Sequence, residues 1–185
     1  MIIGLVSFAR GGKDTLGRGF LDVLPNGRRY AFADELKNRI DPFLTKEFGI
    51  SAFTNNDEEK LLIRPMLVAY GAGIRKKDPD FWVNHVMEQI LAEDNFYSHH
   101  IITDVRYENE ARIIQEAGGK VIYLTREGIS PANDEELNSI PPIKNIADIT
   151  IDLPDYKNNL NYSDEDLKEI SCEIAVSLFT QLKAN

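Results

Sequence analysis

The sequence predicts an α/β fold of three layers, in which a parallel sheet of about five strands has helices on both faces. Two observations carry this prediction. Short, mostly apolar runs typical of buried strands alternate with longer segments whose apolar residues recur at helical spacing. The chain of 185 residues is also long enough to bury one compact core, and nothing in it demands two domains. Strands separated by helices are typical of parallel sheets, because each helix carries the chain back to the same edge.

Charge and composition exclude several classes of function. The chain is 43% hydrophobic and 28% charged, as in an ordinary globular protein, and its 30 acidic and 21 basic residues give a net charge of −9. A net negative charge disfavours sequence-independent electrostatic attraction to nucleic acid or anionic lipid, so we expect neither as a partner. Any phosphate-binding site must therefore be a local one.

The single cysteine, Cys172, excludes an internal disulfide framework and a zinc site built from several thiolates. The apolar first residues lack a basic segment before them and meet Arg10 too early for a signal peptide. No stretch approaches the ~18 apolar residues of a membrane span. These features predict a cytoplasmic protein without a membrane partner, and they leave open whether it is a monomer or a homodimer.

The first half of the chain is expected to contain two strands and three helices. An apolar strand ends in Gly11-Gly12, and three later segments have the apolar spacing of helices. Pro42 is expected to break or distort the helix that begins near Asp34, and Pro65 the helix that begins near Asp57. The glycines at 71 and 73 are expected to end that last helix. The predicted elements are strand 2–8, helix 13–24, strand 29–33, helix 34–48 and helix 57–70.

The second half continues the alternation. Asp78-Pro79 is a typical start for a helix, and Ser163 is a typical cap for the last one. Residues 126–145 hold three prolines among Asn, Asp and Glu, so a long loop is expected there. The predicted elements are strand 99–103, which delivers Asp104, helix 108–117, strand 120–125 and strand 147–153.

The strongest chemical signal is the run Ser-Phe-Ala-Arg-Gly-Gly-Lys-Asp-Thr at residues 7–15, between a predicted strand and a predicted helix. A glycine-rich turn lets successive backbone N–H groups point at a phosphate, and the helix N-terminus adds its positive dipole end. Lys13 would lie between the β- and γ-phosphates of ATP. The predicted ATP-binding residues are Ala9, Arg10, Gly11, Gly12, Lys13, Asp14 and Thr15.

The run departs twice from the G-x-x-x-x-G-K-[ST] pattern. Ser7 replaces the first glycine, and Asp14 stands where a hydroxyl normally meets Mg²⁺. A carboxylate beside a triphosphate is repelled unless a divalent cation lies between them, so Asp14 is predicted to contact Mg²⁺ directly or through water. Thr15 could donate to the α-phosphate. The alternative is a surface strand-turn-helix junction with a chance Gly-Gly-Lys.

Three stretches, taken in order, resemble the deoxynucleoside monophosphate kinases of bacteriophages. They are Gly-Gly-Lys-Asp-Thr at 11–15, Ala-Phe-Ala-Asp-Glu-Leu-Lys at 31–37 and Thr-Asp-Val-Arg-Tyr-Glu-Asn-Glu at 103–110. The similarity runs from residue 1 to about 126 and includes Arg64, Gly71, Arg75 and Trp82. The resemblance implies the P-loop nucleoside monophosphate kinase fold over residues 1–185. It also implies a helical acceptor-binding region at about 34–95, a lid-like loop at about 126–145 and, for a phage protein, the host cytoplasm.

The activity that the resemblance implies is transfer of the ATP γ-phosphoryl group to a deoxynucleoside 5′-monophosphate, with Mg²⁺. Such a reaction needs alignment and cations around the transferring phosphate. Arg106 and Arg126 follow predicted strands, where the strand ends meet the crevice of an open sheet, and with Lys13 they are the predicted catalytic residues. Asp104 is expected to hold Mg²⁺ through water with Asp14, or else to cap the next helix.

The predicted acceptor-binding residues are Asp34, Lys37, Arg64, Arg75, Trp82 and Arg106. The resemblance places Arg64 and Arg75 at the anion of the monophosphate. Asp34 and Lys37, about one helical turn apart, either line the acceptor site or are a helix cap and an exposed lysine. Trp82 lies on an apolar helical stripe, which favours core packing over stacking on a base.

Other functions remain open at this stage. A different small P-loop kinase, acting on dephospho-coenzyme A, a sugar acid or phosphomevalonate, would share the phosphate loop. A regulator that binds ATP without transferring phosphate would share it too. The several arginines favour transfer, because a sensor needs no second anion site.

Overall fold

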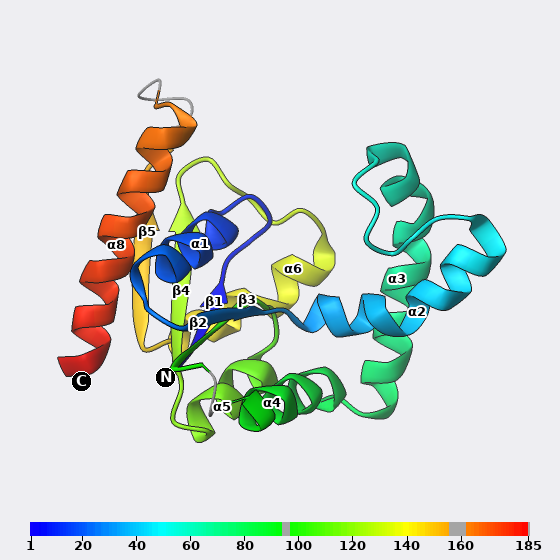
Figure 1. Cartoon of the computed structure of the whole chain (residues 1–185), viewed down its shortest axis with the longest axis horizontal. Helices are drawn as coiled ribbons and strands as arrows, with labels where there is room; N and C mark the ends of the chain where they lie inside the picture. Colours follow the sequence, from blue (N-terminus) through cyan, green and yellow to red (C-terminus); the bar gives the residue numbers. More distant parts are fainter. Residues whose placement is uncertain (94–96, 156–161, 185) are drawn as a thin grey trace. The chain divides into compact units, whose positions relative to one another are not determined.

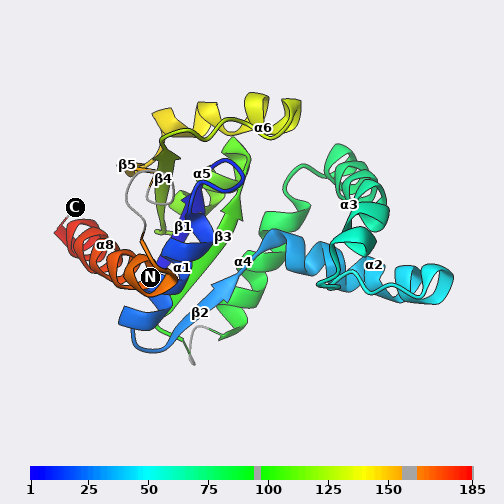
Figure 2. The same cartoon turned by 90° about the horizontal axis from the view of Figure 1, so that it is seen from above.

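A computed structural model gives the structure of the protein, and it describes residues 1–93, 97–155 and 162–184. The chain divides into two units (Figures 1 and 2). The sheet unit contains Met1–Tyr30 and Ile90–Asn185, and the helical unit contains Ala31–Gln89.

Five parallel strands form the sheet, as the sequence predicts. The order across the sheet is β2-β3-β1-β4-β5, and every neighbouring pair is parallel. The first strand therefore lies in the middle, with β3 on one side and β4 on the other, which makes its carboxyl end the switch point where open α/β sheets bind ligands. The strands are β1 Ile2–Val6, β2 Gly27–Tyr30, β3 His99–Val105, β4 Lys120–Arg126 and β5 Ile149–Leu153.

Helices cover both faces of this sheet. Neighbouring residues of β1 point to opposite faces, and each face meets a different helix. A side chain at Gly4 would meet Ile114 of α5 (Glu108–Glu116), whereas one at Gly17 of α1 (Lys13–Val23) would approach Leu5. The C-terminal helix α8 (Asp164–Ala184) packs along α1, and Figure 1 shows the two side by side. The core between the sheet and the helices α1 and α8 holds Ile3, Leu5, Leu16, Phe20, Leu24, Ile101, Ile122, Leu124, Ala175, Leu178 and Leu182.

The helical unit has its own small core. The unit consists of α2 (Phe32–Phe48), α3 (Asp57–Lys77) and the first turns of α4 (Phe81–Glu93). Asn56 caps α3, since its side chain accepts from the backbone N–H groups of Glu58 and Glu59. The buried residues of this core are Ile40, Leu44, Ala52 and Ile63.

Prolines and glycines interrupt these helices less than the sequence predicts. Pro42 and Pro65 lie inside α2 and α3, and both are exposed, so neither ring has to fit into a packed core. The helix α3 also continues through Gly71 to Lys77. A side chain at Gly71 would come within 2.5 Å of Leu36, so this glycine allows close helix packing instead of ending a helix.

Two other boundaries differ from expectation. Asp104 lies within β3 and Arg126 is the last residue of β4, each in a strand instead of after one. The expected long loop contains two short helices, α6 (Asp134–Ser139) and η1 (Pro141–Asn145). The Asn133 side chain caps α6 by accepting from the Glu136 N–H at 2.9 Å, which explains why this polar segment becomes helical.

The predicted cap of the last helix is confirmed. The Ser163 hydroxyl oxygen accepts from the Asp166 N–H at 3.1 Å, and the Asp166 carboxylate accepts from the Ser163 N–H at 2.7 Å. These reciprocal bonds form a capping box. Among the described residues, no helix has the length and apolar character needed to cross a membrane.

Candidate active site

The predicted phosphate loop, residues 7–15, runs from the buried end of β1 into the first turn of α1. Arg10 and Gly12 have positive φ values of 65° and 99°, and the Gly11 N–H donates to the Phe8 carbonyl at 3.0 Å. Gly12 is the N-cap residue, so the N–H groups that follow it have no partner in an earlier turn of α1. Backbone N–H groups at the start of a helix are of the kind that can bind an anion, and the structure has the tight turn that the sequence predicts before them.

Ser7 and Gly11 depend on one another in this loop. Ser7 is 4% exposed, and a side chain at Gly11 would lie 1.7 Å from the Ser7 hydroxyl oxygen. The serine that replaces the first glycine of the usual pattern is thus accommodated because residue 11 is a glycine. The loop therefore keeps its tight turn despite this departure.

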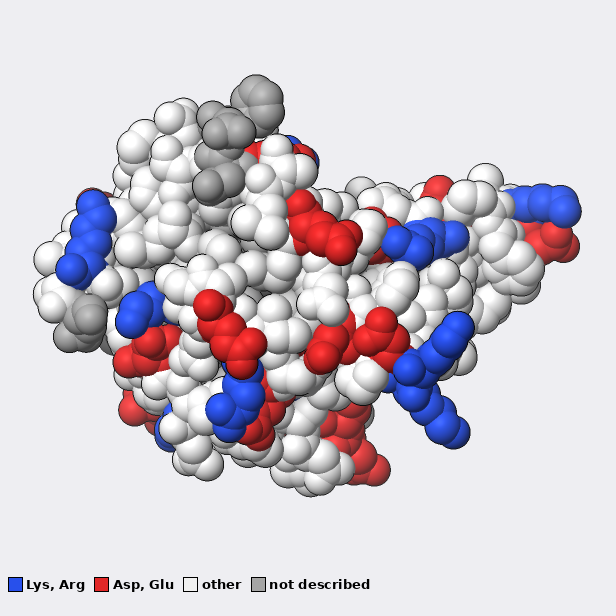
Figure 3. Space-filling view, turned by 90° about the horizontal axis from the view of Figure 1, so that it is seen from below, with Lys and Arg blue, Asp and Glu red and all other residues white. Residues whose placement is uncertain are grey.

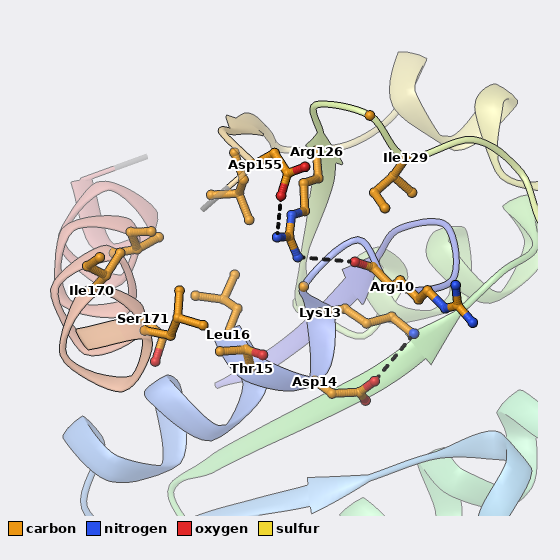
Figure 4. Close-up of a pocket in the computed structure, with 15 residues that line it drawn as sticks. Arg10, Lys13, Asp14, Thr15, Leu16, Arg126, Ile129, Asp155, Ile170 and Ser171 are labelled. Carbon is orange, nitrogen blue, oxygen red and sulfur yellow. Dashed lines mark hydrogen bonds and ion pairs between the residues drawn. The ribbon is translucent and has the colours of Figure 1, made fainter. Parts of the chain in front are cut away.

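Lys13 and Asp14 begin α1 and form an ion pair. The Lys13 Nζ lies 3.5 Å from the Asp14 Oδ2, and the side chains are 12% and 67% exposed. Figure 4 shows the two side chains directed toward each other below Arg10. Asp14 is thus an accessible oxygen donor beside the lysine.

Arg126, at the end of β4, extends over the phosphate loop (Figure 4). Its Nη2 pairs with the Asp155 carboxylate at 3.0 Å, and its Nη1 donates to the Arg10 carbonyl at 3.5 Å. Both Arg126 and Asp155 are 16% exposed. Asp155, just beyond β5, was not predicted, and no local pattern in the sequence marks it.

A cavity of about 640 Å³ lies next to these residues in the sheet unit. One end is polar, with the phosphate loop, Lys13 and Arg126, and the other is apolar, with side chains from α1, β5 and α8 (Figure 4). A charged end joined to an apolar end suits a ligand that carries phosphates on one side and a flat base on the other. The apolar lining residues are Leu16, Ile129, Leu153, Leu167, Ile170 and Ile174.

Arg106 follows β3 and belongs to a second group of contacts. Its backbone N–H donates to the Glu110 carboxylate at 2.8 Å, and its Nη1 lies 3.7 Å from the Glu136 Oε1. Its side chain is 41% exposed. Glu136 is a buried acid that the sequence did not single out, because it reads there as one of several acids in a polar segment.

The N-cap interpretation of Asp104 is wrong. The cap position of α5 is Tyr107, and the Glu110 carboxylate accepts from the N–H groups of Arg106 and Tyr107. Asp104 is half-buried within β3. No group of three or more His, Cys, Asp or Glu side chains that could hold a metal ion occurs in residues 1–93, 97–155 and 162–184.

The other predicted acceptor residues belong to the helical unit. Asp34 is in the first turn of α2, whose N-cap is Ala31, so Asp34 is not a cap. The Lys37 ammonium lies 5.5 Å from the centre of the Phe53 ring. Arg64 and Arg75 lie eleven residues apart on α3, about three turns, and therefore on the same side of that helix.

Trp82 is 1% exposed, and its indole N–H donates to the Gly71 carbonyl at 3.3 Å. Its ring meets Phe81 and Tyr70 edge-on, with centroids 5.0 Å and 6.2 Å away. These are the contacts of a core side chain.

Charge is mixed on the face of the molecule drawn in Figure 3. Lys and Arg lie among Asp and Glu there, and neither sign forms a continuous patch on that face. The basic residues that line the cavity are Arg10, Lys13 and Arg126.

Solved structures with a similar fold are P-loop kinases. The shikimate kinase of Aquifex aeolicus vf5 matches over 100% of both chains, with a TM-score of 0.52 and 16% identity. The shikimate kinase of Acinetobacter baumannii in complex with shikimate covers 97% of this chain and 93% of its own, with a TM-score of 0.50 and 13% identity. At these identities the likeness shows the fold alone.

Sequence comparison gives the family. No curated protein sequence is similar enough to this chain to match it. The family model described as deoxynucleotide monophosphate kinase matches residues 41–139, which is more than half of the chain and includes Arg64, Arg75, Asp104, Arg106 and Arg126. With its P-loop kinase fold and this match, the chain belongs to the deoxynucleotide monophosphate kinase family.

Proposed function

We propose that this protein transfers the γ-phosphoryl group of ATP to a deoxynucleoside 5′-monophosphate, giving ADP and the deoxynucleoside diphosphate. The observation that carries the proposal is the cavity with one charged and one apolar end, in a chain of this family. An oxygen of the acceptor phosphate forms the new bond to the γ-phosphorus. The bond from that phosphorus to the β–γ bridging oxygen breaks, and its electron pair leaves with ADP.

The donor half of this reaction uses the phosphate loop. We assign the backbone N–H groups of residues 12–15 to the phosphates, because those of Ala9 and Gly11 already donate to Glu136 and Phe8. The apolar end of the cavity takes the adenine. Lys13, which is mostly buried, neutralises charge that develops on the bridging oxygen. Arg126 reaches the same end of the cavity and stabilises the transferring group.

Mg²⁺ is the metal ion that this chemistry requires, and the oxygen donors of the site fit it. Asp14 has an accessible carboxylate in the first turn of α1, and Asp104 is half-buried in β3. Two carboxylates are typical for Mg²⁺, which completes its shell with phosphate oxygens and water. We assign these two residues as its protein contacts, and the ion would supply positive charge at the β- and γ-phosphates.

The acceptor half uses the helical region at about 34–95. Arg64 and Arg75 on one side of α3, together with Asp34 and Lys37 of α2, are the groups that we assign to the monophosphate. Arg106 is assigned to the acceptor and transferring phosphates. Residues 126–145 would act as the lid that excludes water.

The test is an assay of the purified protein with Mg²⁺-ATP and each common deoxynucleoside and ribonucleoside monophosphate in turn. ADP is measured over time, with ATP alone as the control. At least one deoxynucleoside monophosphate should raise ADP formation far above the control, and the corresponding diphosphate should appear in equal amount. ADP formation that no monophosphate stimulates would overturn the proposal.

A further inference from the structure

The carboxylate of Glu136 joins three separate parts of the sheet unit. The residue is 3% exposed and lies on α6. Its Oε2 accepts from the Ala9 N–H of the phosphate loop and from the Ala132 N–H, both at 3.1 Å. A buried carboxylate is costly unless it is hydrogen-bonded or paired, so these contacts define a built site for the negative charge.

The third contact of this carboxylate is an arginine. The Glu136 Oε1 lies 3.7 Å from the Arg106 Nη1, while the Arg106 backbone N–H is fixed by Glu110. The neighbouring acid Glu135 accepts a hydrogen bond from the Tyr107 hydroxyl. Two consecutive acids of α6 thus engage the two residues that follow β3.

The exposure of the two partners differs in an informative way. The Glu136 side chain is 4% exposed and the Arg106 side chain is 41% exposed. The carboxylate therefore restrains the guanidinium from the protein side and leaves it accessible to a phosphate. An arginine that is oriented before its ligand arrives loses less conformational entropy when it binds.

We infer that Glu136 is a positioning residue for phosphoryl transfer, which holds Arg106 and the Ala9 end of the phosphate loop in their reacting geometry. This inference rests on the proposed function and extends it, because it assigns to α6 a task inside the site as well as that of a lid. We assign Glu136 no contact with the transferring phosphate or the metal ion, because its carboxylate is already bound to Ala9, Ala132 and Arg106. Its effect on the rate must therefore act through Arg106 and the loop.

Glu136→Gln separates the charge from the hydrogen bonds. Glutamine keeps a carbonyl oxygen for the Ala9 and Ala132 N–H groups, but it places a neutral amide beside Arg106. We expect a melting temperature close to that of the parent and an unchanged KM for ATP. The kcat should fall about ten- to a hundredfold, because small misplacements of a catalytic group are costly.

Glu116→Gln is the matched control, because it makes the same chemical change outside residues 126–145. Glu116 is the last residue of α5, is exposed, and also carries one negative charge. Its kcat should equal that of the parent. Glu136→Asp, which keeps the charge, should retain more kcat than Glu136→Gln, and an Asp variant no better than the Gln variant would contradict a role for the charge.

A double-mutant cycle tests the route through Arg106. If Glu136 acts mainly through this arginine, adding Glu136→Gln to Arg106→Ala should lower kcat no further. A parental kcat in Glu136→Gln, or a full additional loss in the double variant, would overturn the inference. Failure of the parent protein to phosphorylate any deoxynucleoside monophosphate would instead count against the proposed function, so the two failures are distinguishable.

Discussion

The guanidinium of Arg126 is held by the carboxylate of Asp155 at 3.0 Å, beside the phosphate loop. Arg126 ends β4 and is paired in register with Leu153 of β5, so Asp155 lies just beyond the neighbouring strand. Both side chains are only 16% exposed, and the Arg126 Nε is buried without a hydrogen-bond partner in the described structure. The ion pair therefore fixes where this positive charge lies beside the cavity.

Asp155→Asn should destabilise the protein by about 1–3 kcal/mol, because it removes the charge that compensates a mostly buried arginine. Saturating ATP supplies negative charge at the same end of the cavity, so it should narrow the difference in melting temperature between variant and parent. Thermal melts with and without ATP measure this. Asp164→Asn, at an exposed position, is the control. A difference in melting temperature that ATP leaves unchanged would indicate that Arg126 does not contact the nucleotide.

Asp14→Asn should raise the Mg²⁺ concentration needed for half-maximal rate. The carboxylate is the accessible oxygen donor at the start of α1, and the amide that replaces it is a weaker ligand for a hard cation. Asp14→Ser restores the ligand type common in phosphate loops and should keep more activity. A Mg²⁺ titration of initial rates checks both variants, and identical curves would leave Asp14 as a charge that stabilises the helix dipole.

Arg75→Ala should raise the Kd of the monophosphate, and with it the KM, about ten- to a hundredfold. A charge-assisted phosphate contact is worth on the order of 1.5–3 kcal/mol, and the ATP affinity should barely change. Arg64→Ala, on the same side of α3, is expected to behave alike. Isothermal titration with each ligand tests the assignment: weaker ATP binding with normal monophosphate binding would mean that donor and acceptor residues are reversed.

Gly19→Ala should lower stability by about 1–3 kcal/mol through overpacking between α1 and α8. A side chain at this position would lie 2.5 Å from the Ser171 carbonyl oxygen, and backbone cannot move aside cheaply. Gly73→Ala is the matched control inside α3, where nothing lies within 4 Å. It should stabilise the protein by about 0.5–1 kcal/mol, since alanine favours a helix. Chemical denaturation measures both, and equal effects would contradict the close packing of α1 on α8.

The tight turn between β1 and α1 could be predicted because its signal is local: a strand, two glycines, a lysine and a helix follow one another in one short stretch. Glu136 could not be found this way, because its partner Ala9 is 127 positions away, and Asp155 is 29 positions from Arg126. Gly71 was misinterpreted for the same reason. Its role depends on Leu36 of another helix, which no local pattern contains.

The central claim is that the loop after β1 binds the phosphates of ATP for transfer, and Lys13→Ala tests it most directly. Lys13 is 12% exposed, and its ion pair with the exposed Asp14 adds little stability, so the variant should fold as the parent does. The measurement is kcat for ADP formation with the best deoxynucleoside monophosphate, on protein whose melting temperature has been checked. We predict a fall in kcat of about 10²–10³-fold, as for the loss of one preorganised electrostatic group. Equal kcat for folded variant and parent would contradict it.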